Sequence, residues 1–319
     1  MTVIGLDDTD SRDRGMCTTY VADSIARRLA AAGTVVERVL LVRCNPAVEY
    51  KTRGNAALAV HTDADASTAA DVASKVVEAA AETADDRTNP GIVVCDGRPG
   101  AVPDPVVDFA RAAVTDHHTR ENARRVAEAT DYRFETWKNG RGVIGALAAV
   151  GAWAAFDEWT YEHIAYRNPD RWGTPRDVDG ESVFAAADAA YPSVWDTVDR
   201  GTGETVCVPR TPGPVLHGVR GDDPSECRAA AARIEGEAVD RARTFLTNQG
   251  TSPSSRWASV PWFVTNRRAR STASPSMRAA AARHSVGSSP RTPYSTGPGV
   301  RGTQTVSPVP RSTLSQTDG

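Results

Sequence analysis

Apolar residues along the first hundred positions form short runs and helically spaced sets, a pattern that predicts strands alternating with helices. The run Thr2–Leu6 predicts a buried strand, and the apolar positions spaced over Gly15–Ala32 predict a helix. The other expected elements of this part are three strands at Val35–Val42, Ala56–His61 and Gly91–Cys95, and one helix at Ser67–Ala84. Their order is β-α-β-β-α-β, the split βαβ arrangement.

The same order of elements recurs later in the chain. A helical stretch at Pro105–Thr130, a strand at Tyr132–Trp137 and an apolar helix opened by Gly140–Gly145 come first. The second set of elements is then expected at Thr160–Tyr166, Ser182–Ala190, Thr205–Val208, Val215–Val219, Ser225–Ile234 and Arg243–Leu246. The sequence therefore predicts an α/β (α+β) protein with one domain over residues 1–150 and a second over residues 151–250.

Residues 251–319 differ sharply from the rest in composition. They are rich in Ser, Thr and Pro and lose the apolar periodicity, so we expect a disordered tail. This segment holds nine arginines, no lysine and one acidic residue, a net charge of +8, whereas residues 1–250 carry a net charge of −11. Only three lysines occur in the chain, and an acidic, lysine-poor body suggests a cytosol rich in salt, as in a halophile.

Several classes of protein are disfavoured by the sequence. No run of about 18 apolar residues is present, so we expect no membrane span. The N-terminus carries no export signal, which predicts a cytoplasmic protein. The five cysteines are scattered singly, which argues against a zinc site and against a disulfide framework.

An acidic loop follows the first predicted strand. Asp7, Asp8 and Asp10 stand at the carboxyl end of that strand, where ligand sites of α/β sheets usually lie. Carboxylate oxygens suit magnesium, which commonly binds one or two carboxylates together with substrate phosphates. The alternative is a solvated turn that uses aspartate for its turn propensity. The helix start just beyond, with Thr18 in its first turn, favours phosphate, although an ordinary threonine cap is an alternative.

Two lysine-containing loops also point to phosphate. Lys51 and Arg53 lie in the first, and Lys138 and Arg141 lie in the second. Glycines beside these cations, Gly140 and Gly142 in the second loop, allow a ligand to approach the backbone closely. Solvated basic turns are the alternative interpretation.

The second loop also matches the spacing of a dinucleotide-binding fingerprint. It lacks a following βαβ unit with an acidic partner, so a triphosphate site is the better interpretation. His117 and His118 offer a base or a phosphate contact, or simply a hydrated helix start. Together these motifs predict a cytosolic enzyme that uses magnesium and a nucleoside triphosphate.

The combination of motifs resembles a known family. The segment Val3–Ser11 followed by Arg14–Tyr20 resembles the start of the archaeal tRNA(Ile) 2-agmatinylcytidine synthetases, the TiaS family. Further segments similar to that family are Lys51–Ala56, Trp137–Ala149, Tyr161–Arg167, Pro214–Gly221 and Thr247–Thr251. The resemblance covers residues 1 to about 251 in order.

The resemblance implies an ATP-dependent ligase that modifies tRNA. Members of this family replace the C2 oxo group of the wobble cytidine in the CAU anticodon of an isoleucine tRNA with agmatine. The C2 oxygen is phosphorylated first, because it is a poor leaving group, and the agmatine amine then displaces phosphate. ATP is consumed to AMP and two phosphates, and the tRNA then reads AUA in place of AUG.

The resemblance also assigns roles to residues of this chain. Asp7, Asp8 and Asp10 would hold magnesium and the triphosphate, and Thr18 matches the threonine that the family autophosphorylates. The phosphate-contacting and ATP-binding residues would be Lys51, Arg53, Lys138, Gly140, Arg141 and Gly142. Glu162 and Tyr166 are candidates for binding agmatine, although core packing is the commoner role for a strand tyrosine.

After Thr251 the sequence departs from the family, which continues into an OB-fold and a zinc ribbon. We interpret residues 251–319 as the product of a frameshift, with a basic RNA-binding tail as the competing interpretation. Two other functions stay open from the sequence: a magnesium–ATP phosphotransferase acting on a small molecule, and an RNA-binding pseudoenzyme. The sequence gives no information on the oligomeric state.

Overall fold

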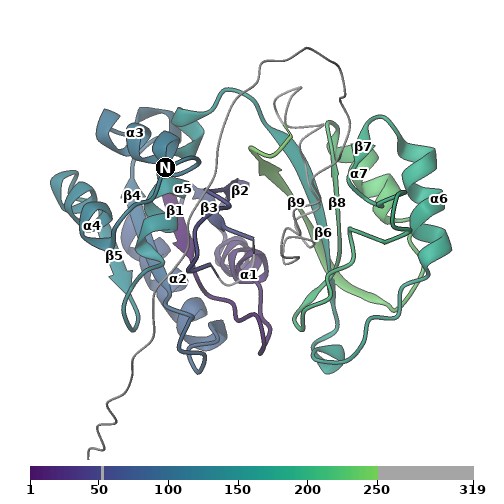
Figure 1. Cartoon of the computed structure of the whole chain (residues 1–319). Helices are drawn as coiled ribbons and strands as arrows, with labels where there is room; N and C mark the ends of the chain where they lie inside the picture. The colour runs from purple at the N-terminus through teal and green to yellow at the C-terminus, as the bar shows by residue number, and fades with distance from the viewer. Residues whose placement is uncertain (52–53, 251–319) are drawn as a thin grey trace, which may run out of the picture. The chain divides into compact units, whose positions relative to one another are not determined.

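The computed structural model describes residues 1–51 and 54–250 of the chain (Figure 1). The strands are β1 (Thr2–Asp7), β2 (Val36–Arg43), β3 (Ala56–Thr62), β4 (Gly91–Asp96), β5 (Arg133–Thr136), β6 (Thr160–Arg167), β7 (Val194–Trp195), β8 (Val215–Gly221) and β9 (Val239–Thr247). The helices are α1 (Thr18–Ala31), α2 (Ala66–Ala80), α3 (Asp104–Ala112), α4 (Arg120–Ala129), α5 (Val143–Ala155), α6 (Gly180–Ala190) and α7 (Pro224–Ala231), with short 3₁₀ turns at Pro99–Ala101 and Pro169–Arg171. The predicted α/β class is therefore confirmed. The predicted tail, residues 251–319, lies outside the described residues.

The described strands form one mixed sheet in the order β5-β4-β1-β3-β2-β9-β6-β8-β7. Two sets of four strands within this sheet have the same topology: β4-β1-β3-β2 and β9-β6-β8-β7. If the strands of each set are numbered 1 to 4 along the chain, their order in the sheet is 4-1-3-2. Both sets have the element order β-α-β-β-α-β, as the sequence predicts. They meet where β2 pairs in parallel with β9, with Leu40 opposite Leu246 and Leu41 opposite Thr247.

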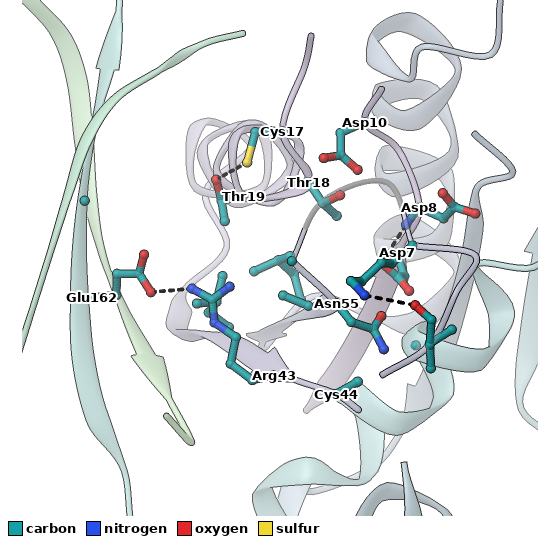
Figure 2. A pocket seen from close by; sticks show the side chains of 18 of the residues that line it. Asp7, Asp8, Asp10, Cys17, Thr18, Thr19, Arg43, Cys44, Asn55 and Glu162 are labelled. Carbon is teal, nitrogen blue, oxygen red and sulfur yellow. Dashed lines mark hydrogen bonds and ion pairs between the residues drawn. The ribbon is translucent and has the colours of Figure 1, made fainter. Parts of the chain in front are cut away.

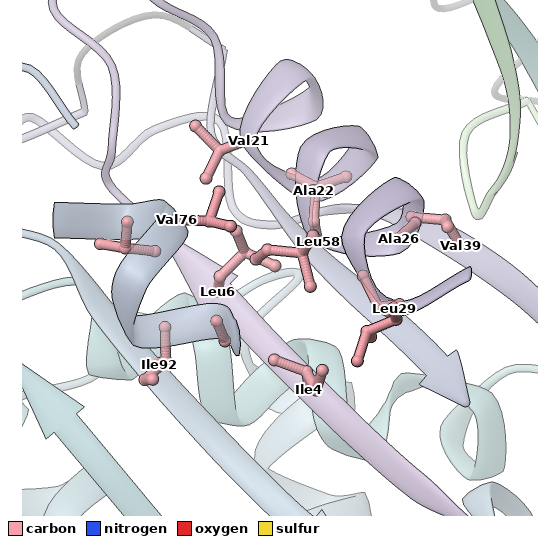
Figure 3. Packing of buried hydrophobic residues seen from close by; sticks show 14 of the residues in the cluster. Ile4, Leu6, Val21, Ala22, Ala26, Leu29, Val39, Leu58, Val76 and Ile92 are labelled. Atoms are coloured by element: carbon pink, nitrogen blue, oxygen red, sulfur yellow. The ribbon is translucent and has the colours of Figure 1, made fainter. Parts of the chain in front are cut away.

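Helices cover both faces of the sheet in its first part. On one face α1 and α2 pack their apolar sides onto Ile4, Leu6 and Leu58 of the strands, as Figure 3 shows. On the other face the alanine-rich helix α5 lies against the strands, with α3 and α4 packed around it (Figure 1). A smaller core joins α7 to β8. Helix α5 is apolar all round because it is buried on nearly every side.

Two predicted elements differ from the structure. The helical stretch Pro105–Thr130 is two helices, since Thr119 caps the start of α4 through a hydrogen bond from the backbone N–H of Asn122. The strand predicted at Thr205–Val208 is wrong: these residues form a turn in which Val206 and Cys207 are buried. The second strand of this set is instead β7, Val194–Trp195. Two residues are too few to show an alternation of apolar and polar positions.

A buried carboxylate ties α1 to β9. Asp23 of α1 is fully buried, and its carboxylate accepts from Arg27 Nε at 2.9 Å on the same helix. Arg241 Nε lies 3.2 Å from the same carboxylate, and Arg243 Nε also pairs with it. The guanidinium of Arg241 stacks on the ring of Tyr20, 3.8 Å from its centre. Helix α1, which begins at Thr18, is thereby held against the second part of the sheet.

Replacing His61 with phenylalanine is expected to reduce the acid sensitivity of the fold. His61 of β3 is fully buried edge-on against Trp153, and neither of its ring nitrogens has a hydrogen-bond partner among the described residues. Burial, with the nearby charge of Arg38, lowers its pKa to about 3 from the usual 6.5. The unfolded chain therefore binds a proton below pH 6.5 that the folded protein takes up only near pH 3.

Stability is consequently lost as the pH falls through that window, by about 2 kcal/mol at pH 5 for this one group. Denaturant unfolding at pH 7.5 and pH 5 measures the loss, and His61→Phe should reduce it by about that amount. The exposed His117 provides the matched control, because His117→Gln should leave the pH dependence unchanged. An unaltered pH dependence in His61→Phe would contradict the prediction.

No helix among the described residues combines the length and apolar character needed to cross a membrane.

Candidate active site

A cavity of about 540 Å³ lies where the acidic loop, the start of α1 and the strands of the second set meet. Among the residues singled out in the sequence, those that line it are Asp7, Asp8, Asp10, Thr18, Lys51, Arg141, Glu162, His117 and His118. Figure 2 shows Asp7, Asp8, Asp10 and Thr18 on one side of this space and Glu162 with Arg43 on the other. The structure thus brings together motifs that are far apart in the chain.

The acidic loop crowds negative charge at the end of β1. Burial and the charge of Asp8 raise the pKa of Asp7 well above its usual value. Asp7 Oδ1 accepts the backbone N–H of Asp8 at 2.7 Å. Asp8 has left-handed backbone geometry, with φ of +60°, which turns its carboxylate into the cavity lining. Burial raises the pKa of Asp8 to about 6, although Arg141 acts in the opposite direction.

Arg141 is the cation that faces the acidic loop. Its Nε and Nη2 donate to Asp8 Oδ2 at 3.1 Å and 2.7 Å, and Nη2 also donates to the backbone oxygen of Arg87 at 2.6 Å. Its side chain is 21% exposed and that of Asp8 is 7% exposed, so the pair lies mostly out of water. A guanidinium held in this way beside carboxylates is suited to contact phosphate oxygens.

The glycines of the second lysine loop make room for Asp7. A Cβ added at Gly145 would lie 2.1 Å from Asp7 Oδ2, and one added at Gly142 would lie 2.6 Å from the Asp7 backbone oxygen. These glycines therefore allow the start of α5 to lie directly against the end of β1. Gly140 has φ of +72° in the preceding turn, and neither Gly140 nor Gly142 is among the cavity-lining residues.

The lysines differ in their placement. Lys51 lines the cavity, and its Nζ donates to the backbone oxygens of Pro46 at 2.6 Å and Val48 at 3.0 Å. Lys138 is outside the lining, and its Nζ donates to the backbone oxygen of Asp85 at 2.6 Å. Arg53, expected to bind ATP, lies outside the described residues.

Thr18 is the first residue of α1 and opens on the same cavity. Its hydroxyl oxygen accepts a hydrogen bond from the hydroxyl of Thr9 at 3.1 Å. The N-cap residue Cys17 makes no side-chain cap bond, and its backbone oxygen accepts the N–H of Tyr20 at 2.9 Å. The first turn of α1 therefore places a hydroxyl nucleophile and helix amides near the three aspartates.

The second set of strands contributes a charged pair, Glu162 and Arg220, to the cavity wall. Of the two, only Glu162 was predicted from the sequence. Glu162 of β6 lies directly opposite Arg220 of β8 in the strand register. Its Oε2 accepts from Arg43 Nη2 at 2.7 Å and from Arg220 Nε at 3.2 Å. Burial favours the protonated acid, yet the charges of Arg220 and Arg43 hold the pKa of Glu162 below its usual value. No hydrogen bond from the described residues reaches its other oxygen, Oε1, which faces Gly218.

Asn248 fixes the position of Arg43. Its side-chain oxygen accepts the backbone N–H of Arg43 at 2.8 Å, and its amide donates to the Arg43 backbone oxygen at 3.1 Å. The asparagine side chain thus continues the β2–β9 pairing by one more step. The signal for Arg43 in the sequence was its place directly after the apolar run Val39–Val42, and the signal for Arg220 was an arginine within the mostly apolar strand β8.

Tyr166 and the two histidines have structural contacts. Tyr166 is fully buried, packs edge-on against Tyr20, and is not among the cavity-lining residues. His118 packs on Phe109 with ring centres 4.1 Å apart, and burial lowers its pKa. His117 is exposed at the edge of the cavity.

The three aspartates of the acidic loop fit a magnesium ion that is held by protein carboxylates together with phosphate oxygens. Within residues 1–51 and 54–250, no group of three or more His, Cys, Asp or Glu side chains is arranged as a complete metal site. Magnesium commonly takes only one or two carboxylates and completes its shell with phosphates and water. Burial, followed by the charges of Asp8 and Asp10, raises the pKa of Asp7, and a divalent cation at the loop would favour its charged form.

Comparisons with known proteins agree with this geometry. The family model described as the TiaS TCKD domain matches residues 3–66, and that described as the TiaS FLD domain matches residues 140–253. An isoleucine-tRNA 2-agmatinylcytidine synthetase TiaS from Haloquadratum walsbyi is 54% identical over 252 residues, covering 79% of this chain and 54% of the relative. The corresponding protein from Methanosarcina acetivorans is 43% identical, covering 78% and 59%.

Solved structures of TiaS are similar to the described chain. A complex of TiaS with its isoleucine tRNA and ATP matches with a TM-score of 0.72 and 38% identity, over 78% of this chain and 59% of that one. A complex of TiaS with the same tRNA, AMPCPP and agmatine matches with a TM-score of 0.70 and 38% identity, over 77% and 59%. The chain thus spans between 54% and 59% of the length of these relatives. Because the two family models together match more than half of the chain, it belongs to the TiaS family.

Proposed function

We propose that this protein is an ATP-dependent ligase that attaches agmatine to C2 of the wobble cytidine in the CAU-anticodon isoleucine tRNA. The observation that carries the proposal is the cavity shared by the hydroxyl of Thr18, the three aspartates and Arg141. Phosphoryl transfer depends on positioning and on charge stabilisation, and this arrangement supplies both. The similarity to TiaS complexes with tRNA, ATP and agmatine supports these partners.

The proposal gives each part of the cavity a role. Asp7, Asp8 and Asp10 would hold magnesium, which would neutralise negative charge on the triphosphate. Arg141 and Lys51 would contact phosphate oxygens, and Arg53 and Lys138 would support ATP binding from the loops beside them. Thr18 would accept the phosphoryl group. ATP and magnesium are thus the proposed cofactors.

We propose that Glu162 binds agmatine: its Oε1 would accept a hydrogen bond from one of the two cationic ends of the ligand. Gly218 keeps that oxygen open, because a Cβ there would lie only 3.1 Å from it. Ile164 and Val215 line the cavity nearby and offer apolar surface for the butyl chain. Tyr166 is fully buried and does not line the cavity, so we assign it no contact with agmatine.

The proposed organisation is an ATP-binding, kinase-like domain over residues 1–150 and a second, ferredoxin-like domain over 151–250, acting in the cytoplasm. Residues of both parts line the cavity.

Labelled agmatine, ATP, magnesium and a CAU-anticodon isoleucine tRNA transcript in molar KCl test the proposal. We expect tRNA-dependent incorporation of agmatine and phosphate on Thr18. A transcript with a GAU anticodon is the matched control and should take up no agmatine. ATP turnover independent of tRNA would instead indicate a small-molecule phosphotransferase, and tRNA binding with neither signal would indicate a pseudoenzyme.

A further inference from the structure

Thr9 stands between two of the aspartates of the acidic loop, yet it is fully buried. Its hydroxyl donates to the hydroxyl oxygen of Thr18 at 3.1 Å. Its backbone oxygen accepts the N–H of Glu82 at 3.0 Å, which anchors the loop to the segment after α2. The side chain of Thr9 is therefore directed inward while its two neighbours, Asp8 and Asp10, line the cavity.

A hydroxyl group has one hydrogen to donate and two lone pairs that accept. Because Thr9 donates to Thr18, the hydrogen of Thr18 is free to point away from Thr9, toward the cavity. We propose that Thr9 is a positioning residue that sets the side-chain rotamer of Thr18 and aims its remaining lone pair and its hydrogen into the cavity. This inference rests on the proposed role of Thr18 as phosphoryl acceptor.

The reaction explains why that orientation matters. The bond from Thr18 Oγ to the γ-phosphorus forms as the bond from that phosphorus to the bridging oxygen breaks, and that oxygen leaves with the electron pair on the β-phosphate group. The hydroxyl proton passes to a cavity carboxylate. The attacking oxygen must be in line with the leaving oxygen, and a small misplacement of the nucleophile slows such a step strongly. The side-chain hydrogen bond of Thr9 goes to Thr18, so loss of the Thr9 hydroxyl should lower the rate of transfer and leave ATP binding unchanged.

The test compares three variants by the rate of phosphate transfer to Thr18, followed with labelled ATP and mass spectrometry. Thr9→Val keeps the shape and loses the hydroxyl, and it should lower the rate at saturating ATP roughly tenfold with the KM for ATP unchanged. Thr9→Ser restores the hydroxyl and should recover most of the rate. Thr2→Val is the matched control, since Thr2 is an equally buried threonine of β1 whose hydroxyl donates to the Ala64 backbone oxygen at 2.6 Å.

The outcomes separate the two proposals. If the unaltered protein acquires no phosphate on Thr18, the proposed role of Thr18 fails and Thr9 has no acceptor to position, whereas failure to incorporate agmatine overturns the proposed function itself. If the unaltered protein is phosphorylated and Thr9→Val reacts equally fast, the positioning role is overturned. An equal loss of rate in Thr9→Ser, or a loss matched by Thr2→Val at temperatures where unfolding curves show all variants folded, would also overturn it.

Discussion

Asp8→Asn is expected to slow phosphate transfer to Thr18 by about 100- to 1000-fold at saturating ATP and magnesium. The substitution keeps the shape of the side chain but removes the negative charge that faces both the proposed magnesium and Arg141. Arg141 Nε and Nη2 would then face a neutral amide in a mostly buried setting. The Arg141 guanidinium, proposed to contact phosphate, would lose its charged partner, and the proposed magnesium site would lose a ligand, so the two effects would act together. Quench-flow or manual sampling of labelled Thr18 measures the rate.

Asp13→Asn provides the matched control for Asp8→Asn. Asp13 belongs to the same loop but is exposed, and it pairs with the exposed Arg87. We expect its transfer rate to stay within a factor of about two, because exposed pairs contribute little. If Asp8→Asn transfers phosphate at the normal rate while its unfolding midpoint falls, Asp8 is only a structural partner of Arg141.

Asp23→Ala is expected to lower the free energy of unfolding by about 3 kcal/mol. The carboxylate of Asp23 is fully buried and is shared by Arg27, Arg241 and Arg243. Without it, three guanidinium groups are left close together with no compensating charge. Their side chains are 17% to 48% exposed and can reach water, which places the loss at the lower end of the range for a broken buried pair. Denaturant unfolding in high salt measures the change.

Arg27→Ala removes the most exposed partner of Asp23 and should cost less than about 1 kcal/mol. The two variants together distinguish the buried carboxylate from the surface pair. A loss in Asp23→Ala no larger than in Arg27→Ala would show that α1 is held by its apolar face alone.

The elements with a clear period were predictable from the sequence. The run at β1 and the apolar spacing of α1 directly reflect burial on one face, so both were found to within a few residues. The strand predicted at Thr205–Val208 was wrong because Val206 and Cys207 are buried as part of the cavity lining and not as part of a strand. Alternation alone does not distinguish a buried turn from a short strand.

The wall of the candidate site that carries the acidic loop was predictable from the sequence, whereas the wall around Glu162 was only partly predictable. Asp7, Asp8, Asp10 and Thr18 are close in sequence, so a local motif identifies them. Arg43 and Arg220 join Glu162 only through the pairing of four strands far apart in the chain, in the order β2-β9-β6-β8. Strand register is a tertiary property, and no spacing within the sequence encodes it.

The parallel pairing of β2 with β9 has a consequence for how the chain folds as it is made. Strand β2 is complete once Arg43 has been added, yet its partner ends only at Thr247. A ribosome adding about 5 to 20 residues per second needs some tens of seconds at the slower rates to cover that separation. During this interval β2 is an edge strand, with backbone groups able to pair with another chain. Until β9 has been made, this edge of β2 is therefore a place where two nascent chains can pair with each other.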